Sequence, residues 1–202
     1  MGKQKSMFVC SQCGFETAKW FGKCPSCGEW NTLNEEVVAE ITAKTAVASV
    51  KNMCSLKLKD ISVDNEHRYH TGVGELDRVL GGGIVKGSLI LLGGDPGIGK
   101  STIMLQICEH LGKSLSVLYV SGEESQRQIK IRAERLGVET DNLSVMSEID
   151  AEAICEFIRT SNPDIVIIDS IQTMSITELN SSPGSVTQVR ECTNLFLRTA
   201  KN

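Results

Sequence analysis

From about residue 71 onward, short apolar runs alternate with segments whose apolar residues recur at helical spacing. The runs are typical of buried strands and cover residues 88–93, 116–120, 143–146 and 165–169. Helical spacing predicts helices over residues 73–80, 102–111, 124–136, 150–160 and 183–201. Such alternation predicts an α/β fold, in which helices cover both faces of a mostly parallel sheet. The ligand site of this sheet is expected at the carboxyl ends of its strands.

A glycine-rich loop joins the first of these strands to its helix, and it fits the pattern G-x-x-x-x-G-K-[ST] of a phosphate-binding P-loop. Its glycines let successive N–H groups turn toward a phosphate, and the helix N-terminus adds positive potential. We expect Lys100 to reach the β- and γ-phosphates and Ser101 to bind Mg²⁺. The alternative, a glycine-rich turn with a chance lysine, would not need the flanking strand and helix. The predicted nucleotide contacts are Gly94, Asp95, Pro96, Gly97, Ile98, Gly99, Lys100, Ser101 and Thr102.

Acidic residues follow two of the later strands. Asp169 ends a run of four β-branched residues, as a Walker B aspartate does, and would hold Mg²⁺ through water or through Ser101. Its alternative role is that of a helix cap or turn residue. Glu123 and Glu124 follow the strand over 116–120, where a carboxylate would orient or deprotonate the water that attacks ATP. Alternatively, these two residues are the acids that a helix N-terminus favours.

Four cysteines near the N-terminus form two Cys-x-x-Cys knuckles, with ten residues between them: Cys10, Cys13, Cys24 and Cys27. A glycine follows the second cysteine of each knuckle, where the turn around a metal needs a positive φ. Four thiolates at this spacing predict a structural, tetrahedral Zn²⁺ site with no open position. Two disulfides and an iron–sulfur cluster are the alternatives.

Three aromatic residues accompany the knuckles: Trp20, Phe21 and Trp30. We expect them to pack on the knuckles. The alternative is that they stack on nucleic-acid bases, because exposed aromatic rings beside lysines (here Lys19 and Lys23) are typical of nucleic-acid binding.

The chain therefore divides into a zinc ribbon over residues 1–32, a linker over 33–58 and a nucleotide domain over 59–202. A net charge of −4 does not indicate a nucleic-acid binder. No apolar run approaches the ~20 residues that span a bilayer, and the N-terminus lacks the apolar region of a secretory signal. We expect a cytoplasmic protein without a membrane partner.

Four segments together resemble the RadA (Sms) family of bacterial DNA-repair proteins, which are RecA-like ATPases. They are the cysteine ribbon with its flanking tryptophans, residues 71–83, the P-loop, and the pair formed by residues 119–125 and 169–173. The P-loop alone is common to many families, whereas the combination with the ribbon is specific. The resemblance covers essentially the whole chain.

The resemblance implies a zinc ribbon followed by a RecA-like P-loop domain. It also implies that Gly94 to Ser101 bind ATP and Mg²⁺, that Asp169 has the Walker B role, and that Lys100 and Glu123 are catalytic residues. Members of this family hydrolyse ATP in a DNA-dependent manner. They act on single-stranded or branched DNA and drive branch migration of recombination intermediates in partnership with RecA. They form hexameric rings that bind ATP at subunit interfaces.

The chain departs from the family after its last predicted helix. Three features of the family are absent from this sequence. They are the next strand, which in the family lies between the P-loop strand and the Walker B strand, the Lys-Asn-Arg-Phe-Gly motif, and the Lon-protease-like domain. We therefore expect a fragment whose sheet is incomplete, with an exposed apolar edge and weak or absent ATP hydrolysis. Two alternative functions remain: another RecA-core protein, either a helicase or an autokinase, and a non-hydrolysing zinc-binding interaction module regulated by nucleotide.

Overall fold

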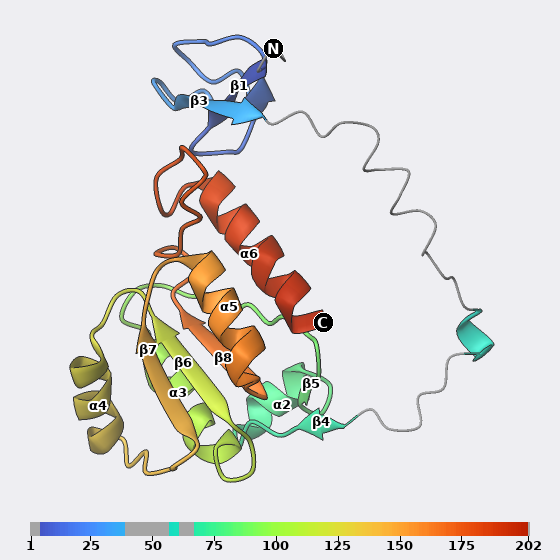
Figure 1. Cartoon of the computed structure of the whole chain (residues 1–202), viewed down its shortest axis with the longest axis vertical. Helices are drawn as coiled ribbons and strands as arrows, with labels where there is room; N and C mark the ends of the chain where they lie inside the picture. Colours follow the sequence, from blue (N-terminus) through green and yellow to red (C-terminus); the bar gives the residue numbers. More distant parts are fainter. Residues whose placement is uncertain (1–4, 39–56, 61–66, 202) are drawn as a thin grey trace. The chain divides into compact units, whose positions relative to one another are not determined.

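The computed structural model describes residues 5–38, 57–60 and 67–201. The chain divides into two compact units, Met1–Glu66 and His67–Asn202, which are treated separately below. Figure 1 shows the elements of each unit. No helix among the described residues is both long enough and apolar enough to cross a membrane.

The first unit is an antiparallel sheet of three short strands in the order β2-β1-β3. The strands are β1 (Lys5–Cys10), β2 (Glu16–Thr17) and β3 (Leu33–Val38). Its core is small: Cys10, Cys24 and Leu33 are buried, and Phe8 and Phe15 pack against them. So little apolar surface does not stabilise a domain of this size, and a structural metal would supply what is missing.

The ribbon extends past the boundary expected at residue 32. The six residues of β3 pair along the whole of β1, from Cys10 opposite Leu33 to Lys5 opposite Val38. The start of the expected linker is therefore part of the ribbon's sheet, because its backbone groups complete the ladder of β1. Of the rest of that segment, 39–56 lies outside the described residues, and a single 3₁₀ turn, η1, covers Leu58–Asp60.

The second unit contains the alternating strands and helices that the sequence predicts. Its three-stranded sheet is parallel, with the order β7-β6-β8. A two-stranded antiparallel ribbon, β4 with β5, precedes it. The elements in chain order are β4 (Arg68–Tyr69), α2 (Gly74–Val79), β5 (Ile84–Val85), α3 (Lys100–Leu111), β6 (Val117–Ser121), α4 (Gln126–Arg135), β7 (Leu143–Ser147), α5 (Ala151–Ser161), β8 (Ile165–Asp169) and α6 (Val186–Lys201).

Helices cover both faces of the parallel sheet, as predicted. Alternate residues of β6 point to opposite faces, so Val117 and Tyr119 pack with α3 and α4, whereas Leu118 and Val120 pack with α5 and α6. In Figure 1, α5 and α6 lie in front of the sheet and α3 lies behind it. All five residues of β6 are buried, which fits its place at the centre of the sheet.

Local signals fix where the helices begin. Ser125 caps α4 through a capping box with Gln128, and the Asp150 side chain accepts hydrogen bonds from two N–H groups of α5. Helix α3 begins at Lys100, directly after Gly99, whose φ of 101° places it in the left-handed region. The helix therefore starts inside the P-loop motif itself.

The strand predicted over residues 88–93 was wrong. This segment forms no strand, and Leu89, Ile90 and Leu91 are 42%, 43% and 80% exposed. A strand requires a ladder partner, and no described segment pairs with these residues. Strand β8 pairs with β6 along one edge, and no described strand pairs with its other edge. The expected apolar edge is thus present, and the residues of β8 other than Ile167 are only partly buried.

Candidate functional site

The P-loop takes the backbone conformation that the motif requires. Gly97 and Gly99 have φ values of 79° and 101°, in the left-handed region that glycine adopts without strain. A Cβ atom at either position would meet no atom within 4 Å. The glycines are therefore needed for backbone conformation, and not because a neighbouring group leaves no room.

Lys100 lies at the start of α3 and folds back over the loop. Its Nζ donates hydrogen bonds to the carbonyl oxygens of Gly94, at 2.7 Å, and Asp95, at 2.9 Å. The ammonium group is thus held against the loop at the N-terminus of a twelve-residue helix, where the helix dipole also favours an anion. Ser101 follows within the same first turn. The Lys100 ammonium suits the phosphates of a nucleotide, and the hydroxyl oxygen of Ser101 suits the Mg²⁺ ion that accompanies them.

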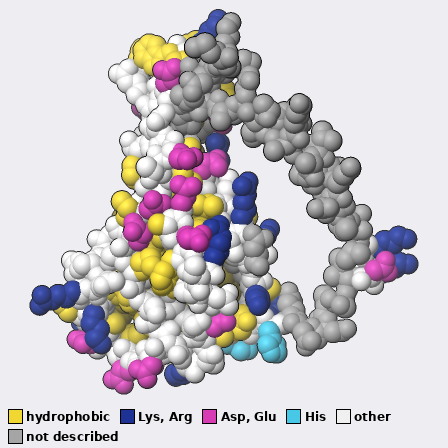
Figure 2. Space-filling view, in the orientation of Figure 1, with side chains coloured by type: hydrophobic (Ala, Val, Ile, Leu, Met, Phe, Trp, Pro, Cys, Tyr) yellow, Lys and Arg dark blue, Asp and Glu magenta, His cyan; other side chains and the backbone are white. Residues whose placement is uncertain are grey.

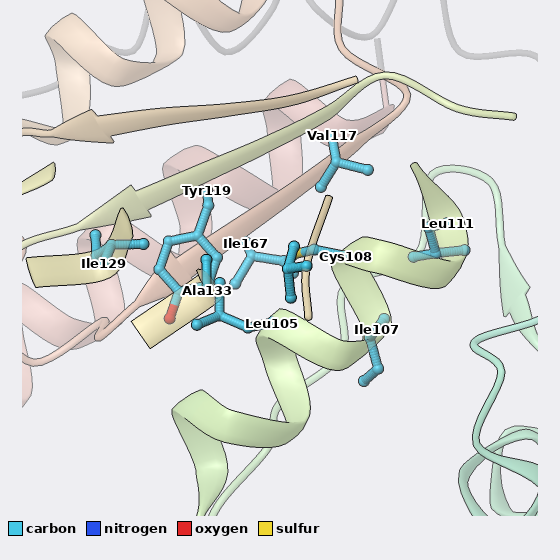
Figure 3. Packing of buried hydrophobic residues seen from close by; sticks show 10 residues of the cluster. Leu105, Ile107, Cys108, Leu111, Val117, Tyr119, Ile129, Ala133 and Ile167 are labelled. Carbon is cyan, nitrogen blue, oxygen red and sulfur yellow. The ribbon is translucent and has the colours of Figure 1, made fainter. Parts of the chain in front are cut away.

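Side-chain packing brings α3 to the sheet. Leu105, one turn beyond Ser101, belongs to the same buried cluster as Tyr119 and Ile167. Figure 3 shows Leu105 near the Tyr119 ring and Leu111 toward Val117, so α3 runs opposite to β6. Its N-terminal end, with the P-loop, therefore lies toward the carboxyl ends of the strands. This is the edge at which the sequence predicts the ligand site.

Asp169, the last residue of β8, is held by a tyrosine from the neighbouring strand. The Tyr119 hydroxyl donates a hydrogen bond to Asp169 Oδ2. Burial raises the pKa of Tyr119, and the hydrogen bond to Asp169 and the charge of that carboxylate raise it further, so the phenol remains a donor. One carboxylate oxygen of Asp169 is therefore held by the neighbouring strand. Sequence reasoning missed Tyr119, although the hydroxyl of a tyrosine in an otherwise aliphatic buried strand needs a partner.

The structure separates the roles of the two glutamates after β6. Glu123 Oε1 accepts a hydrogen bond of 2.7 Å from the hydroxyl of Ser170, the residue after Asp169. Glu124 instead forms an ion pair with Arg132 of α4. Glu123 and Asp169 are thus brought together at the ends of adjacent strands, and Glu124 is directed toward a helix. Ser170 was also missed, because its contact is 47 residues away in the chain.

A close backbone approach supports this arrangement. The N–H of Gly122 donates to the Asp169 carbonyl at 3.0 Å, and a Cβ atom at Gly122 would lie 2.1 Å from Thr173 Oγ1. Only glycine allows the turn after β8 to pack against the turn after β6. Beside it, an open hollow of about 310 Å³ is lined by residues 121–125 and 147–149 at the ends of β6 and β7.

The four cysteines of the ribbon converge as the spacing predicts. Their Sγ atoms all lie within 4.8 Å of one another. The Sγ atoms of Cys10 and Cys27 are 3.7 Å apart, and those of Cys13 and Cys24 are 3.6 Å apart. A tetrahedral site with Zn–S bonds of about 2.3 Å has edges of about 3.8 Å, whereas a disulfide bond measures about 2.05 Å. The four thiols are free, so the geometry is that of a metal centre and the disulfide alternative was wrong.

The backbone around the knuckles also fits a metal. Gly14 and Gly28 have φ values of 72° and 78°, as expected, and each donates its N–H to the carbonyl of the first cysteine of its knuckle. Burial raises the pKa of the Cys10 thiol, but hydrogen bonds with Thr32 and with backbone N–H groups outweigh it and lower the pKa to about 6. A backbone hydrogen bond at Glu29 lowers the pKa of Cys27, but desolvation and the other three cysteines together outweigh it and raise the pKa to about 12. Four thiolates this close together need a cation between them.

The ribbon's aromatic residues do not pack as expected. Trp20, Phe21 and Trp30 are 56%, 43% and 67% exposed. The small core is filled instead by Leu33 and the buried cysteines, with Phe8 and Phe15 packed around them. Figure 2 shows hydrophobic side chains on the surface of this unit. The prediction that the three rings pack on the knuckles was therefore wrong.

Comparison with known proteins finds family models that match the region of the cysteines and the region of the P-loop. The family model described as rubredoxin metal binding domain matches residues 8–35, and the one described as KaiC matches residues 69–151. Proteins named DNA repair protein RadA are similar over nearly the whole chain. The relative from Bacillus subtilis is 50% identical, in an alignment that covers 100% of this chain and 45% of the relative. The relative from Aquifex aeolicus is 48% identical, and the alignment covers 96% of this chain and 43% of the relative. The relative from Pseudomonas aeruginosa is 47% identical over 100% and 45%.

The chain thus spans less than half the length of these relatives. Among solved structures, it resembles one described as a DnaB-like replicative helicase and its interactions with primase. The TM-score is 0.54 at 16% identity, over 80% of this chain and 46% of the helicase. That likeness concerns the fold alone.

Proposed function

We propose that this chain, a member of the RadA family of RecA-like ATPases, carries the nucleotide site and zinc ribbon of a DNA-dependent ATPase of recombinational DNA repair. One observation above all supports the proposal: Ser170, the residue after Asp169, donates a hydrogen bond to Glu123, which holds Glu123 at the ends of β6 and β8, where Asp169 ends β8. The edge that they share is the one toward which the P-loop end of α3 lies.

Each residue of the site then has a separate task. The loop amides from Gly94 onward and the ammonium of Lys100 bind the phosphates of ATP. Ser101 and Asp169 would hold Mg²⁺, which neutralises charge on the β- and γ-phosphates when it is bound. Glu123 orients the attacking water and accepts its proton.

The hydrogen bonds described above set the direction of these groups. Tyr119 holds one carboxylate oxygen of Asp169, so this group, which would be a ligand of Mg²⁺, is oriented before the ion binds. Ser170 keeps Glu123 beside the edge of the sheet, and the ion pair with Arg132 keeps Glu124 out of the site. Pre-orientation of this kind is the main contribution that a protein makes to phosphoryl transfer.

The finer functional assignments rest on the resemblance and on the names of the relatives. We propose that the full-length protein works in the bacterial cytoplasm and promotes branch migration of recombination intermediates, with RecA, on single-stranded or branched DNA. We further propose that it does so as a hexameric ring. Figure 2 shows acidic and basic side chains interspersed on the visible face of the nucleotide unit, so charge on that face does not explain DNA binding.

The test is ATP turnover by the full-length gene product, with and without single-stranded DNA. We expect DNA to stimulate turnover, and we expect Lys100→Ala to abolish it through loss of phosphate binding. Glu123→Gln should bind ATP but turn it over at least 100-fold more slowly, because it cannot accept a proton. Glu124→Gln is the matched control and should retain most of the activity, since Glu124 is paired with Arg132.

Two other outcomes would point elsewhere. Tight nucleotide binding without turnover under any condition would favour a nucleotide-regulated interaction module, a role compatible with a Lys100 that is hydrogen bonded to its own loop. Transfer of label from the γ-phosphate to the protein itself would favour an autokinase.

A further inference from the structure

The zinc ribbon presents aromatic and basic side chains together on its surface. We call Trp20, Phe21 and Trp30, with Lys19 and Lys23, the aromatic platform. The three rings are about half exposed or more, although rings of this size are usually buried where nothing binds them. In a unit with so small a core, burying them would have been favourable. Their exposure therefore needs a functional reason.

The two indoles converge over a glycine. A Cβ atom built on Gly22 would lie 3.7 Å from Trp20 Cη2 and 3.7 Å from Trp30 Cζ3, which is van der Waals contact with both rings. The rings thus share one small area of the surface although they are ten positions apart in the chain. Two neighbouring rings offer a stacking surface to more than one base of a single strand.

The backbone beneath the platform is fixed by the second knuckle. The N–H of Asn31 donates to the Gly22 carbonyl at 2.9 Å, and that of Cys24 donates to the Glu29 carbonyl at 2.8 Å. Lys23 and Trp30 also face each other across an isolated antiparallel bridge. Because these bonds hold both arms of the loop, the rings are presented without much loss of conformational entropy on binding.

The charge around the rings favours an anionic partner, though only modestly. Residues 17–28 contain Lys19 and Lys23 and no acidic residue. The Lys23 ammonium lies over the Trp30 ring, 5.7 Å from its centroid, so a positive charge stands at one face of the ring. The four thiolates outweigh the charge of Zn²⁺, however, so the surface is not strongly basic. A partner would have to be held by stacking more than by charge.

We propose that the aromatic platform binds single-stranded nucleic acid, with unpaired bases stacked on Trp20 and Trp30 and with Lys19 and Lys23 beside the flanking phosphates. Unpaired bases offer free π-faces, whereas bases in a duplex are stacked on one another, so binding discriminates in favour of single strands. This contact adds to the nucleic-acid binding of the proposed ATPase and does not depend on ATP.

The chain offers a direct readout, because Trp20 and Trp30 are its only two tryptophans. Intrinsic tryptophan fluorescence therefore reports on the platform alone. Titration of the zinc-loaded 202-residue chain with oligo-deoxythymidine should quench this fluorescence, and a duplex of the same length should not.

Labelled oligonucleotide, followed by anisotropy, gives the affinity of the variants. Trp20→Ala and Trp30→Ala should each weaken binding by about 5- to 150-fold, and Trp→Phe at the same positions should retain much of it. Phe157→Ala, which removes a similarly exposed ring (41%) from α5, is the matched control and should have no effect. Zinc content confirms that each variant keeps its ribbon. Two lysine–phosphate contacts predict a shallow salt dependence, with log K falling by about 1.4 per tenfold rise in salt.

Unchanged tryptophan fluorescence during the oligonucleotide titration, in a chain that retains its zinc, would overturn the proposal. So would equal affinities of the parent and the Trp20→Ala/Trp30→Ala double variant. If only a protein partner altered the fluorescence, the platform would be a protein-docking surface instead. The proposed ATPase would survive each of these results, because its own test is DNA-stimulated turnover lost in Lys100→Ala.

Discussion

Replacing Tyr119 with phenylalanine tests whether Asp169, the proposed Walker B carboxylate, is held from the neighbouring strand. The substitution removes one hydroxyl and leaves the ring, which fills its place among the buried residues of α3, α4 and β8. It therefore deletes the hydrogen bond to Asp169 without opening a large cavity. Tyr119 is only 1% exposed, so water does not reach the vacated side of the ring freely.

The expected magnitude follows from the kind of bond that is lost. A hydrogen bond to a charged group contributes about 1.5–3 kcal/mol. Asp169 is only partly buried, so water can replace the lost donor in part. We therefore expect a decrease of about 1–2 kcal/mol in the free energy of unfolding. In the full-length enzyme, the released carboxylate should also raise the Mg²⁺ concentration needed for half-maximal turnover several-fold.

The assay is urea unfolding followed by far-UV circular dichroism. All the described α-helices lie in the nucleotide unit, so this signal reports on that unit and not on the ribbon. Tyr69→Phe is the matched control, since Tyr69 is the chain's other tyrosine. The reasoning is refuted if Tyr119→Phe unfolds at the same urea concentration as the parent, or if Tyr69→Phe is equally destabilised.

Three further predictions concern other parts of the chain. Ser170→Ala should lower the kcat of the proposed full-length ATPase about tenfold at an unchanged KM for ATP, because Glu123 loses the hydrogen bond that positions it. Ser170→Thr keeps a hydroxyl and should restore kcat. Equal rates in the parent, Ser170→Ala and Ser170→Thr would exclude a positioning role for Ser170. Removal of zinc with a chelator should abolish the hydrogen-exchange protection of β1 and β3, since metal binding contributes about 10–16 kcal/mol in small zinc domains. The helical circular-dichroism signal of the nucleotide unit should stay intact. Protection of β1 and β3 that persists after complete zinc removal would contradict this prediction. Asp164 accepts hydrogen bonds from the N–H and hydroxyl of Ser116, which hold the pKa of its carboxyl below 3.8. The contribution of Asp164 to stability is therefore present above pH 3.8 and is lost as the pH falls through the lowered pKa. Asp164→Asn should be less stable than the parent at neutral pH and equally stable in strong acid. A difference in unfolding free energy between the two proteins that does not vary with pH would refute this.

Elements with a strong local signal were predicted closely from the sequence. The run of β-branched residues before Asp169 gives β8 its predicted bounds, Ile165–Asp169, and caps at Ser125 and Asp150 mark the starts of α4 and α5. The zinc site was equally accessible, because its ligand spacing and glycines are local features. The segment over 88–93 was misassigned for the opposite reason: its composition is that of a strand, but strand formation depends on a partner elsewhere in space.

The candidate site was predictable in its separate parts and not in its connections. The P-loop, Asp169 and the glutamates after β6 can each be located from short patterns. The Tyr119–Asp169 and Ser170–Glu123 contacts join residues 50 and 47 positions apart. Only the pairing of β6 with β8 brings them together. The choice of Glu123 over Glu124 likewise depends on Arg132, whose position is set by the start of α4.

Residues 88–93 pair with no described strand, so the two halves of the candidate site are attached to the sheet in different ways. Backbone ladders fix the acidic half of the site, since Glu123 and Asp169 follow strands that are hydrogen bonded to each other. The phosphate-binding half is joined to that sheet through the buried side chains of α3, such as Leu105 and Cys108. Such a packed interior is hardly compressible and transmits strain, so a change of side-chain volume within it is felt by its neighbours. The spacing between lysine and carboxylates thus depends on the packing beneath α3, and truncation of Leu105 should alter it without any change in the P-loop itself.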